Sequence, residues 1–301
     1  MKFSKMTFAG AALALLAALP AAADSYAEMF PELANDAEMA DVNELLAGLD
    51  FRRGTVSLGE ANASLDMGEN YYFLGPVDAA YVLETLWENP PGAPVLGMVF
   101  PTDRTPLHDG WGMVLEYEAM GYVSDEDAVG YDYDALLTEM QADTASQNDW
   151  RLENGYESIE LVGWAEPPRY DQVGRKLYWA QELRFGDSAP NTVNYEIRAL
   201  GRHGVLIMNM VASMDQLGDV RAAAPDLLTM VAYDEGSRYS DFDPSMDKVA
   251  AVGIGGLIAG KVAAKAGLLA VALAFLKKGF ILLLLPLFWL KNMFTRKPTS
   301  A

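Results

Sequence analysis

The sequence predicts an α+β fold: a single exported domain with a mostly antiparallel sheet and about three helices, followed by a C-terminal transmembrane segment. Apolar and polar residues alternate along residues 177–185 and 193–199 with the two-residue period of a half-buried strand. A turn at Gly201–Gly204 joins the second run to an apolar, more buried run at 205–211. Helical patterns interrupt these runs without regular βαβ alternation, which favours an α+β arrangement over a parallel sheet.

Further strands are predicted from short apolar or alternating runs bounded by turn residues. Tight turns between consecutive short strands favour antiparallel pairing. These predicted strands are Thr55–Leu58, Ala63–Met67, Val95–Phe100, Gly112–Tyr117 and Ser158–Trp164.

Three helices are predicted, each after an aspartate that can cap its first turn. The first follows Asp78 and ends at the Asn-Pro-Pro-Gly run 89–92. The second follows Asp134. The third follows Asp215 and is broken or restarted at Pro225, because proline removes a helical hydrogen bond.

The N-terminus has the pattern of a secretory signal peptide. Lys2 and Lys5 precede an apolar run to residue 19, and three alanines precede Asp24. Small residues at that place are typical of a cleavage site, and the apolar run is too short to span a bilayer. We therefore expect residues 1–23 to be a signal peptide and the mature body to lie in a bacterial periplasm.

Charge is divided between the two parts of the mature chain. All 42 acidic residues lie within 24–247 with only 12 Lys or Arg, which gives a formal charge of −30. Residues 248–301 hold 8 basic residues and no acid. The body should repel nucleic acid, so none is expected as a partner. This asymmetry predicts an acidic extracytoplasmic domain, residues 24–247, fastened to the membrane by its C-terminus.

The C-terminal segment is predicted to anchor the protein in the bacterial inner membrane as a single-pass protein. We expect residues 248–276 to form a transmembrane helix, followed by a basic cytoplasmic or interfacial tail, 277–301. A span from about 266 to 290 is the alternative, although it places Lys277 and Lys278 near mid-bilayer at a cost of about 2.5–3.5 kcal/mol each. Whether the chain crosses the membrane once or twice stays open.

Two glycines in the predicted transmembrane helix, Gly256 and Gly260, have the spacing of a GxxxG pair. Such pairs let membrane helices approach closely, which suggests helix association and a homo-oligomer formed through the tail.

Only one loop offers candidates for catalysis or metal binding. His108 lies near Asp103 and Asp109, which suggests a general base or metal ligand oriented by a carboxylate. No nucleophile or second set of ligands accompanies it, so a locally hydrogen-bonded polar loop is the favoured interpretation. The acidic run 125–127 lacks the spacing of a calcium loop and is expected to be a solvated surface. The chain has no cysteine, which removes disulfides and thiolate sites, and neither a metal nor a cofactor is predicted.

Several segments of the mature chain resemble a family of uncharacterised bacterial membrane-anchored proteins whose exported domain has no known function. The resemblance implies an exported domain with a C-terminal anchor and supplies no catalytic residue. The order of strands and helices is also loosely similar to that of photosystem-associated PsbP-like domains, which implies nothing about function. The segments that carry the family resemblance are 54–58, 71–74, 87–92, 162–168, 194–195, 200–204, 236–242 and 259–267.

These observations predict a non-enzymatic envelope protein. Its acidic periplasmic domain binds a protein partner or supports membrane maintenance or stress tolerance. One alternative is a hydrolase or metal-dependent enzyme that uses the His108 loop. Another is an oligomeric pore formed by the glycine-rich tail.

Overall fold

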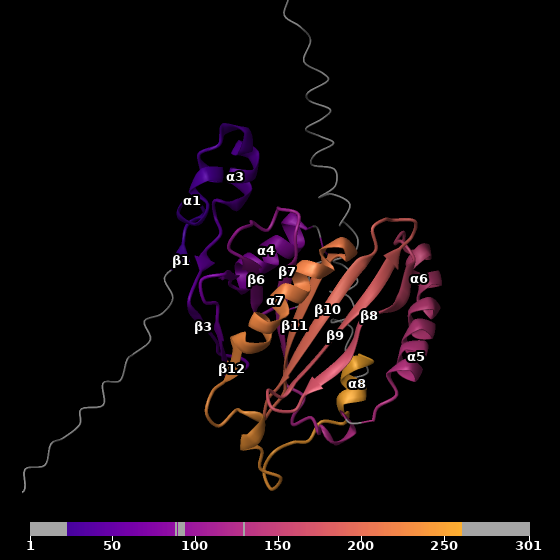
Figure 1. Cartoon of the computed structure of the whole chain (residues 1–301). Coiled ribbons are helices and arrows are strands. Elements are labelled where there is room, and N and C mark those ends of the chain that lie inside the picture. The colour runs from indigo at the N-terminus through magenta and orange to yellow at the C-terminus, as the bar shows by residue number, and fades with distance from the viewer. Residues whose placement is uncertain (1–22, 88, 90–93, 129, 261–301) are drawn as a thin grey trace, which may run out of the picture.

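A computed structural model of the chain describes residues 23–87, 89, 94–128 and 130–260 (Figure 1). Its main feature is a sheet of nine strands in the order β1-β2-β5-β6-β7-β11-β10-β9-β8, in which every neighbouring pair is antiparallel. A second sheet has the order β12-β4-β3. The α+β class and the antiparallel pairing are therefore confirmed, and the main sheet is larger than the sequence predicted.

The strands of the main sheet are β1 (Ala23–Asp24), β2 (Phe51–Arg52), β5 (Tyr71–Leu74), β6 (Gly97–Pro101), β7 (Gly112–Glu118), β8 (Ile159–Asp171), β9 (Lys176–Phe185), β10 (Thr192–Leu200) and β11 (Val205–Ser213). Those of the small sheet are β3 (Thr55–Leu58), β4 (Ala63–Asp66) and β12 (Val231–Tyr233). The α-helices are α1 (Tyr26–Met29), α2 (Pro31–Ala34), α3 (Ala40–Leu46), α4 (Pro76–Tyr81), α5 (Tyr133–Ser146), α6 (Asn148–Glu153), α7 (Leu217–Met230) and α8 (Ile254–Ile258).

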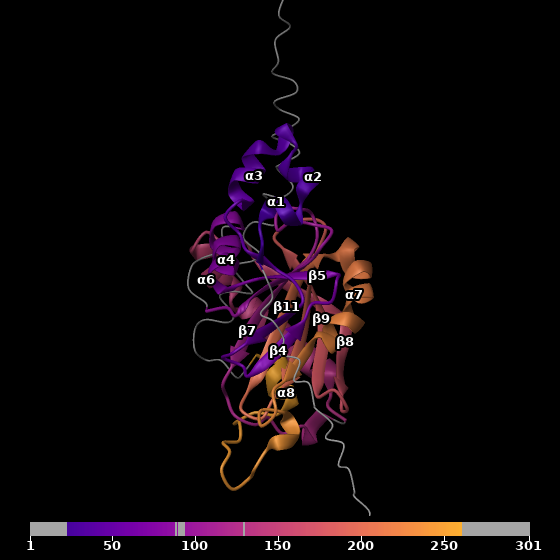
Figure 2. The same ribbon diagram turned by 90° about the vertical axis from the view of Figure 1, so that its left-hand side faces the viewer.

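Helices lie on both sides of the main sheet, with α7 on one side and α4 and α6 on the other (Figure 2). The face under α7, called the first face below, is apolar. Residues spaced along one side of α7 are buried against it: Leu217, Val220, Ala224, Leu227 and Met230. The small sheet joins the same apolar cluster.

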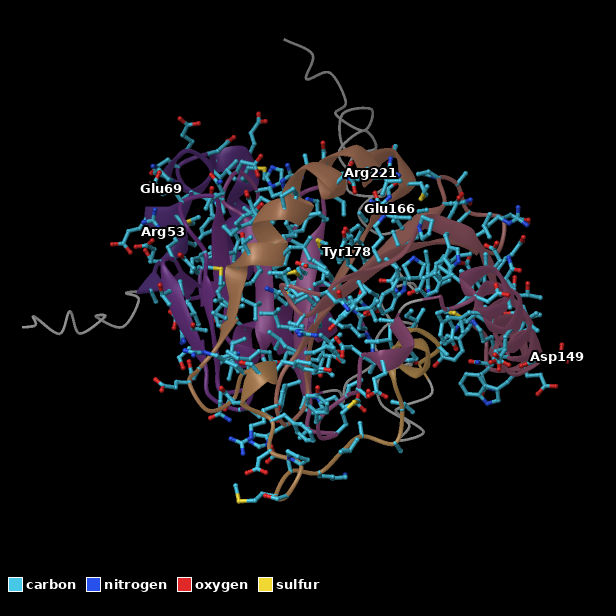
Figure 3. The ribbon with its side chains drawn as sticks, turned by 60° about the horizontal axis from the view of Figure 1, so that its bottom comes forward. Arg53, Glu69, Asp149, Glu166, Tyr178 and Arg221 are labelled. Atoms are coloured by element: carbon cyan, nitrogen blue, oxygen red, sulfur yellow. The ribbon has the colours of Figure 1, made fainter. Side chains whose placement is uncertain are left out.

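An ion pair also fastens α7 to the sheet. Arg221 of α7 pairs with Glu166 of β8, and its guanidinium donates to the carbonyl of Ala165 at 3.2 Å (Figure 3). The helix continues through Pro225 without a break, contrary to the sequence prediction. Proline removes only one backbone hydrogen bond there, while the apolar contacts on both sides of it hold the helix against the sheet.

The opposite face, called the second face, carries two large apolar clusters, and a smaller third one packs beneath α5. One contains Tyr72, Phe100 and Val114 from the strands, with residues of α4 and of the N-terminal helices. The other contains Trp179 and Ile207, with residues of α5 and α8.

The C-terminal part of the described chain belongs to this second cluster. Ile254, Leu257 and Ile258 of α8 are at most 3 % exposed. The carboxylate of Asp127 caps the helix by accepting hydrogen bonds from the amides of Ile254, at 2.9 Å, and Gly255, at 3.2 Å. The folded body therefore extends to at least Ile258, beyond the boundary expected at Asp247.

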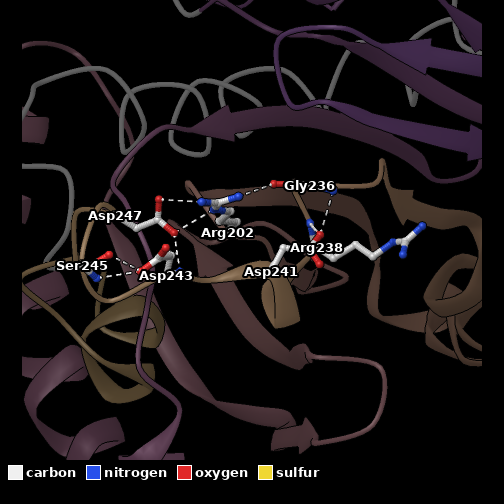
Figure 4. A network of polar contacts seen from close by, with 7 residues as sticks. All are labelled: Arg202, Gly236, Arg238, Asp241, Asp243, Ser245 and Asp247. Atoms are coloured by element: carbon white, nitrogen blue, oxygen red, sulfur yellow. Dashed lines mark hydrogen bonds and ion pairs between the residues drawn. The ribbon is translucent and has the colours of Figure 1, made fainter.

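The loop before α8 is held by Arg202, which follows β10 (Figure 4). Its guanidinium donates to both carboxylate oxygens of Asp247, at 2.7 and 3.1 Å, and to the carbonyl of Gly236 at 3.1 Å. Asp247 in turn accepts from the amide of Asp243 at 2.7 Å. These bonds fix the route of the chain from the sheet to α8.

This placement corrects the predicted anchor. A helix that spans the membrane cannot begin at residue 248, because the chain up to Ile258 packs in the body. None of the helices in the described ranges is long and apolar enough to cross a membrane. The rest of the predicted span, the tail 277–301 and the signal peptide up to residue 22 lie outside the described residues.

Candidate functional site

Five polar side chains form a strip on the second face, between its two large apolar clusters. We call Glu116, Asn194, Glu196, Arg198 and Asn209 the polar strip. They come from three adjacent strands: Glu116 from β7, Asn209 from β11 and the other three from β10. Glu116 and Glu196 are each only 8 % exposed, and Asn194 is 7 % exposed. Burial of ionisable residues to this extent is rare in proteins unless they are paired.

Strand register places these side chains beside one another. Glu196 lies opposite Asn209 in the β10–β11 pair, and Arg198 lies opposite Ile207. Ile207 in turn lies opposite Glu116 in the β11–β7 pair. Since side chains alternate between the faces of a sheet, residues two apart on β10 share the second face with these partners.

The charges in the strip are only partly balanced. A guanidinium nitrogen of Arg198 lies 3.6 Å from a carboxylate oxygen of Glu196, which is close enough for an ion pair but too long for a hydrogen bond. The guanidinium also lies 5.3 Å from the centre of the Trp179 ring, in a cation–π contact. Glu116 has no ion pair with any of the described residues, so the strip holds two carboxylates and one guanidinium.

Five buried polar atoms on this face have no hydrogen-bond partner in the part of the chain that the structure describes. An unpartnered buried polar atom typically costs about 1–3 kcal/mol, so a cluster of five is unusual. Three are acceptors, Asn194 Oδ1, Asn209 Oδ1 and Glu196 Oε2, and two are donors, Arg198 Nε and Trp179 Nε1.

Burial sets the protonation of the strip. The pKa of the Glu116 carboxyl is raised from 4.5 to about 7, chiefly by burial and next by repulsion from Glu196, with a smaller contribution from Glu118 and an opposing one from Arg198. Burial likewise raises the pKa of Glu196, and Arg198 again opposes the change. Both carboxyls would therefore be stabilised by a further positive charge.

The strip has the chemistry of a site for a cationic hydrogen-bond donor. Its unpartnered acceptors outnumber its unpartnered donors, and its carboxylates outnumber its guanidinium. Among the described residues no group of three or more His, Asp or Glu side chains is placed to hold a metal ion.

The loop predicted to carry chemistry does not bring its residues together. Asp103 accepts hydrogen bonds from Arg104, at 2.9 and 3.2 Å, which hold the pKa of its carboxyl below the ordinary value. Asp109 accepts from Gln216 at 2.9 Å. The ring Nδ1 of His108 instead lies 3.0 Å from the hydroxyl of Thr105. Neither aspartate is hydrogen-bonded to the imidazole: Asp103 is bonded within the loop, and Asp109 is bonded to the segment before α7.

The predicted glycine pair does not lie on one continuous helix in the described residues. Gly256 is the third residue of α8, and Gly260 follows the end of that helix with a φ of +66°. A positive φ at this place is typical of the glycine that ends a helix. Association of protein copies through the tail stays a prediction.

Two members of the acidic run 125–127 have structural roles that the sequence prediction missed, although Glu126 and Asp127 are exposed as predicted. Asp125 accepts hydrogen bonds from the hydroxyls of Tyr170, at 2.8 Å, and Tyr239, at 3.1 Å, and pairs with Arg175. Asp127 caps α8. The run thus ties the β8–β9 hairpin and the C-terminal segment to one point.

The sequence contained one signal for the polar strip that the pattern analysis missed. Alternation along 193–199 placed Asn194, Glu196 and Arg198 on the polar side of a strand, which usually faces water. The neighbouring run 205–211 is apolar except for Asn209, and an isolated amide in a strand buried on both faces marks a polar site inside the protein.

Fold and strip together define the class of the protein: an α+β protein built on a broad antiparallel sheet, with one apolar face and one face that holds buried charge. The chain belongs to a family described as "Protein of unknown function (DUF2167)", whose model matches residues 50–288.

A comparison with curated proteins finds no match. Among solved structures, the chain is similar to the solution structure of cyanobacterial PsbP (CyanoP) from Synechocystis sp. PCC 6803, with 10 % identity and a TM-score of 0.35. The match covers 60 % of this chain and 91 % of that one. A similarity at this level says nothing about function.

Proposed function

We propose that this protein is a non-enzymatic, membrane-anchored envelope protein whose acidic domain binds a partner in the bacterial periplasm. The observation that carries the proposal is the separation of charge: −30 in residues 24–247 against +8 in residues 248–301. A strongly acidic body joined to an apolar C-terminus fits a domain held outside the inner membrane, with the five basic residues from Lys277 to Lys297 on the cytoplasmic side.

The geometry of the polar loop supports binding over catalysis. A general base needs an orienting group and a reacting group within hydrogen-bond reach. In the described structure, His108 contacts Thr105, and the two nearby aspartates contact other residues. The hydrolase alternative therefore gains no support from this loop.

A protease experiment tests on which side of the inner membrane the body and the C-terminus lie. Protease added outside the inner membrane should digest the body, while an epitope tag placed after Ala301 stays protected. A cytoplasmic protein serves as the control for leakage. Exposure of the tag together with the body would contradict the single-pass arrangement and favour two crossings, and protection of both would place the body on the cytoplasmic side.

A capture experiment tests partner binding. Trp150 and Leu152 of α6 are each 59 % exposed, and tryptophan is enriched among residues that dominate protein interfaces. Crosslinking in intact membranes followed by pull-down of the full-length chain should recover a partner, and Trp150→Ser with Leu152→Ser should reduce the recovery. The control is Val173→Ser, because Val173 is 95 % exposed at the tip of the β8–β9 hairpin. Equal recovery with all chains would remove α6 as the contact, and no enrichment over a tag-only control would contradict partner binding.

A further inference from the structure

We infer that the polar strip binds the ammonium group of a lysine from the chain's own basic segment that begins at Lys261, with Lys261 and Lys265 as the two donors within reach. The inference goes beyond the proposed function and does not depend on it, since it concerns how the body and the C-terminal segment hold each other.

The first argument is the chemistry of the strip. A lysine ammonium carries one positive charge and three hydrogen-bond donors and has no acceptor. The strip offers three unpartnered acceptors, from Asn194, Asn209 and Glu196, beside a second buried carboxylate, Glu116. One ammonium would make the charges of the two glutamates and Arg198 sum to zero. The binding of a carboxylate or phosphate would instead add negative charge where two buried carboxylates already repel each other.

The second argument is position. The described chain ends at Gly260, directly after α8. The buried residues of α8 share one apolar cluster with Trp179 and Ile207. Trp179 contacts Arg198, and Ile207 lies between Arg198 and Glu116 across the sheet. The chain thus leaves α8 beside the strip and on the same face.

The third argument is length and charge. Residues 261–265 can extend by about 17 Å, and their two lysines sit at the near end of a segment, 261–301, that contains seven basic residues and no acid. A lysine stem packs well along apolar side chains while its ammonium binds at a polar end. The apolar residues that border the strip offer such a surface.

The chain contains no cysteine, so an introduced pair reports on proximity without background. Asn209→Cys combined with Lys261→Cys, and separately with Lys265→Cys, should form an intrachain disulfide when full-length protein in membranes is oxidised. The control pairs Ala222→Cys with Lys261→Cys, because Ala222 is exposed on α7, against the other face of the sheet. At least one strip pair should link several-fold faster than the control.

A second measurement uses the unmodified chain, because Asn209→Cys can itself disturb folding. A carbodiimide joins a carboxylate directly to an amine in contact with it. Peptide mapping should find Lys261 or Lys265 joined to Glu116 or Glu196. Added methylamine should label exposed Asp149 and spare both strip glutamates.

The two measurements separate the sources of the amine. Intrachain links support the inference. Links between two chains would overturn it in favour of the tail of a second copy, and labelling of the strip glutamates by methylamine to the level of Asp149 would overturn it in favour of an open site for external amines. The inference would be wrong if the strip pairs formed disulfides no faster than the Ala222 control and peptide mapping found no lysine joined to a strip glutamate.

Discussion

The two faces of the main sheet are built from the same strands but have different contents. On β11, Met208 and Met210 point to the first face and are fully buried against the cluster of α7, whereas Asn209 between them points to the second face. The same contrast holds on β10, where Tyr195 and Ile197 alternate with Glu196 and Arg198. Both faces carry apolar clusters, but only the second face also holds buried polar groups that cost stability.

The difference between the two faces suggests that the second face carries the function. Apolar packing accounts for the content of the first face, because burial of apolar side chains is the main favourable term in folding. Nothing in folding requires two glutamates on the second face, and replacing buried charge by apolar residues is often neutral or stabilising. A buried polar cluster that costs stability therefore points to binding.

The largest expected difference between the two faces comes from a pair of substitutions at neighbouring residues on β11. Met210→Ala should lower the free energy of unfolding by about 2–5 kcal/mol, because it leaves a cavity on the first face. Asn209→Leu should change it by less than about 1 kcal/mol or raise it, because it removes a buried amide oxygen that has no hydrogen-bond partner in the described structure. Denaturant unfolding of the full-length chain in detergent measures both. Equal losses for the two variants would show that the faces are energetically alike.

A smaller effect is expected at the junction between body and tail. Asp127→Ala should cost about 1 kcal/mol, because it removes the carboxylate that caps α8. Hydrogen exchange should rise in residues 254–258 more than in the sheet. Glu126→Ala, at an exposed neighbouring residue, is the matched control and should change neither quantity. Exchange in α8 that is unaffected by Asp127→Ala would contradict its docking through this cap.

The smallest effect is expected in the His108 loop. His108→Ala removes the contact of an exposed imidazole with the buried Thr105, whose hydroxyl still accepts from the amide of Leu107, and should change the free energy of unfolding by about 0.5 kcal/mol or less. A complementation assay on the same variant should show normal function. A stable His108→Ala protein that is fully inactive would overturn the non-enzymatic proposal and restore the hydrolase alternative.

Local patterns predicted much of this fold because alternation or a continuous apolar run marks most of its strands. Residues 193–199 and 205–211 were predicted as strands from alternation and apolar content, and both are confirmed by β10 and β11. Helix α4 begins at Pro76 rather than after Asp78. Proline fits the first helical position, and Gly75 occupies the N-cap position before it.

The missed elements lack a local signal. The four residues of β5, Tyr71–Leu74, are buried on both faces and show no alternation. Helices α1 to α3 are four to seven residues long, too short to show a helical period. The polar strip was missed because its members come from three strands, and only the register reveals that they meet.

The most direct test of the account is the pH dependence of stability of the full-length chain. The Glu116 carboxyl has a pKa of about 7 in the folded protein against an ordinary 4.5, set by burial and the facing charges of Glu196, Arg198 and Glu118. The unfolded chain loses this proton first as the pH rises, so stability should fall between about pH 4.5 and pH 7 and level off above it. With no added cation the fall amounts to about 3 kcal/mol.

A docked ammonium lowers the pKa of Glu116 and so reduces that fall. The account predicts the steepest loss of stability from pH 4.5 to 7 in the chain with Lys261→Met and Lys265→Met, a smaller loss in the natural chain and the smallest in Glu116→Gln. The midpoint of thermal unfolding, followed by tryptophan fluorescence in detergent across this range, ranks the three chains. Identical pH profiles for all three would contradict the claim that the second face holds a buried carboxylate ready to bind the chain's own lysine.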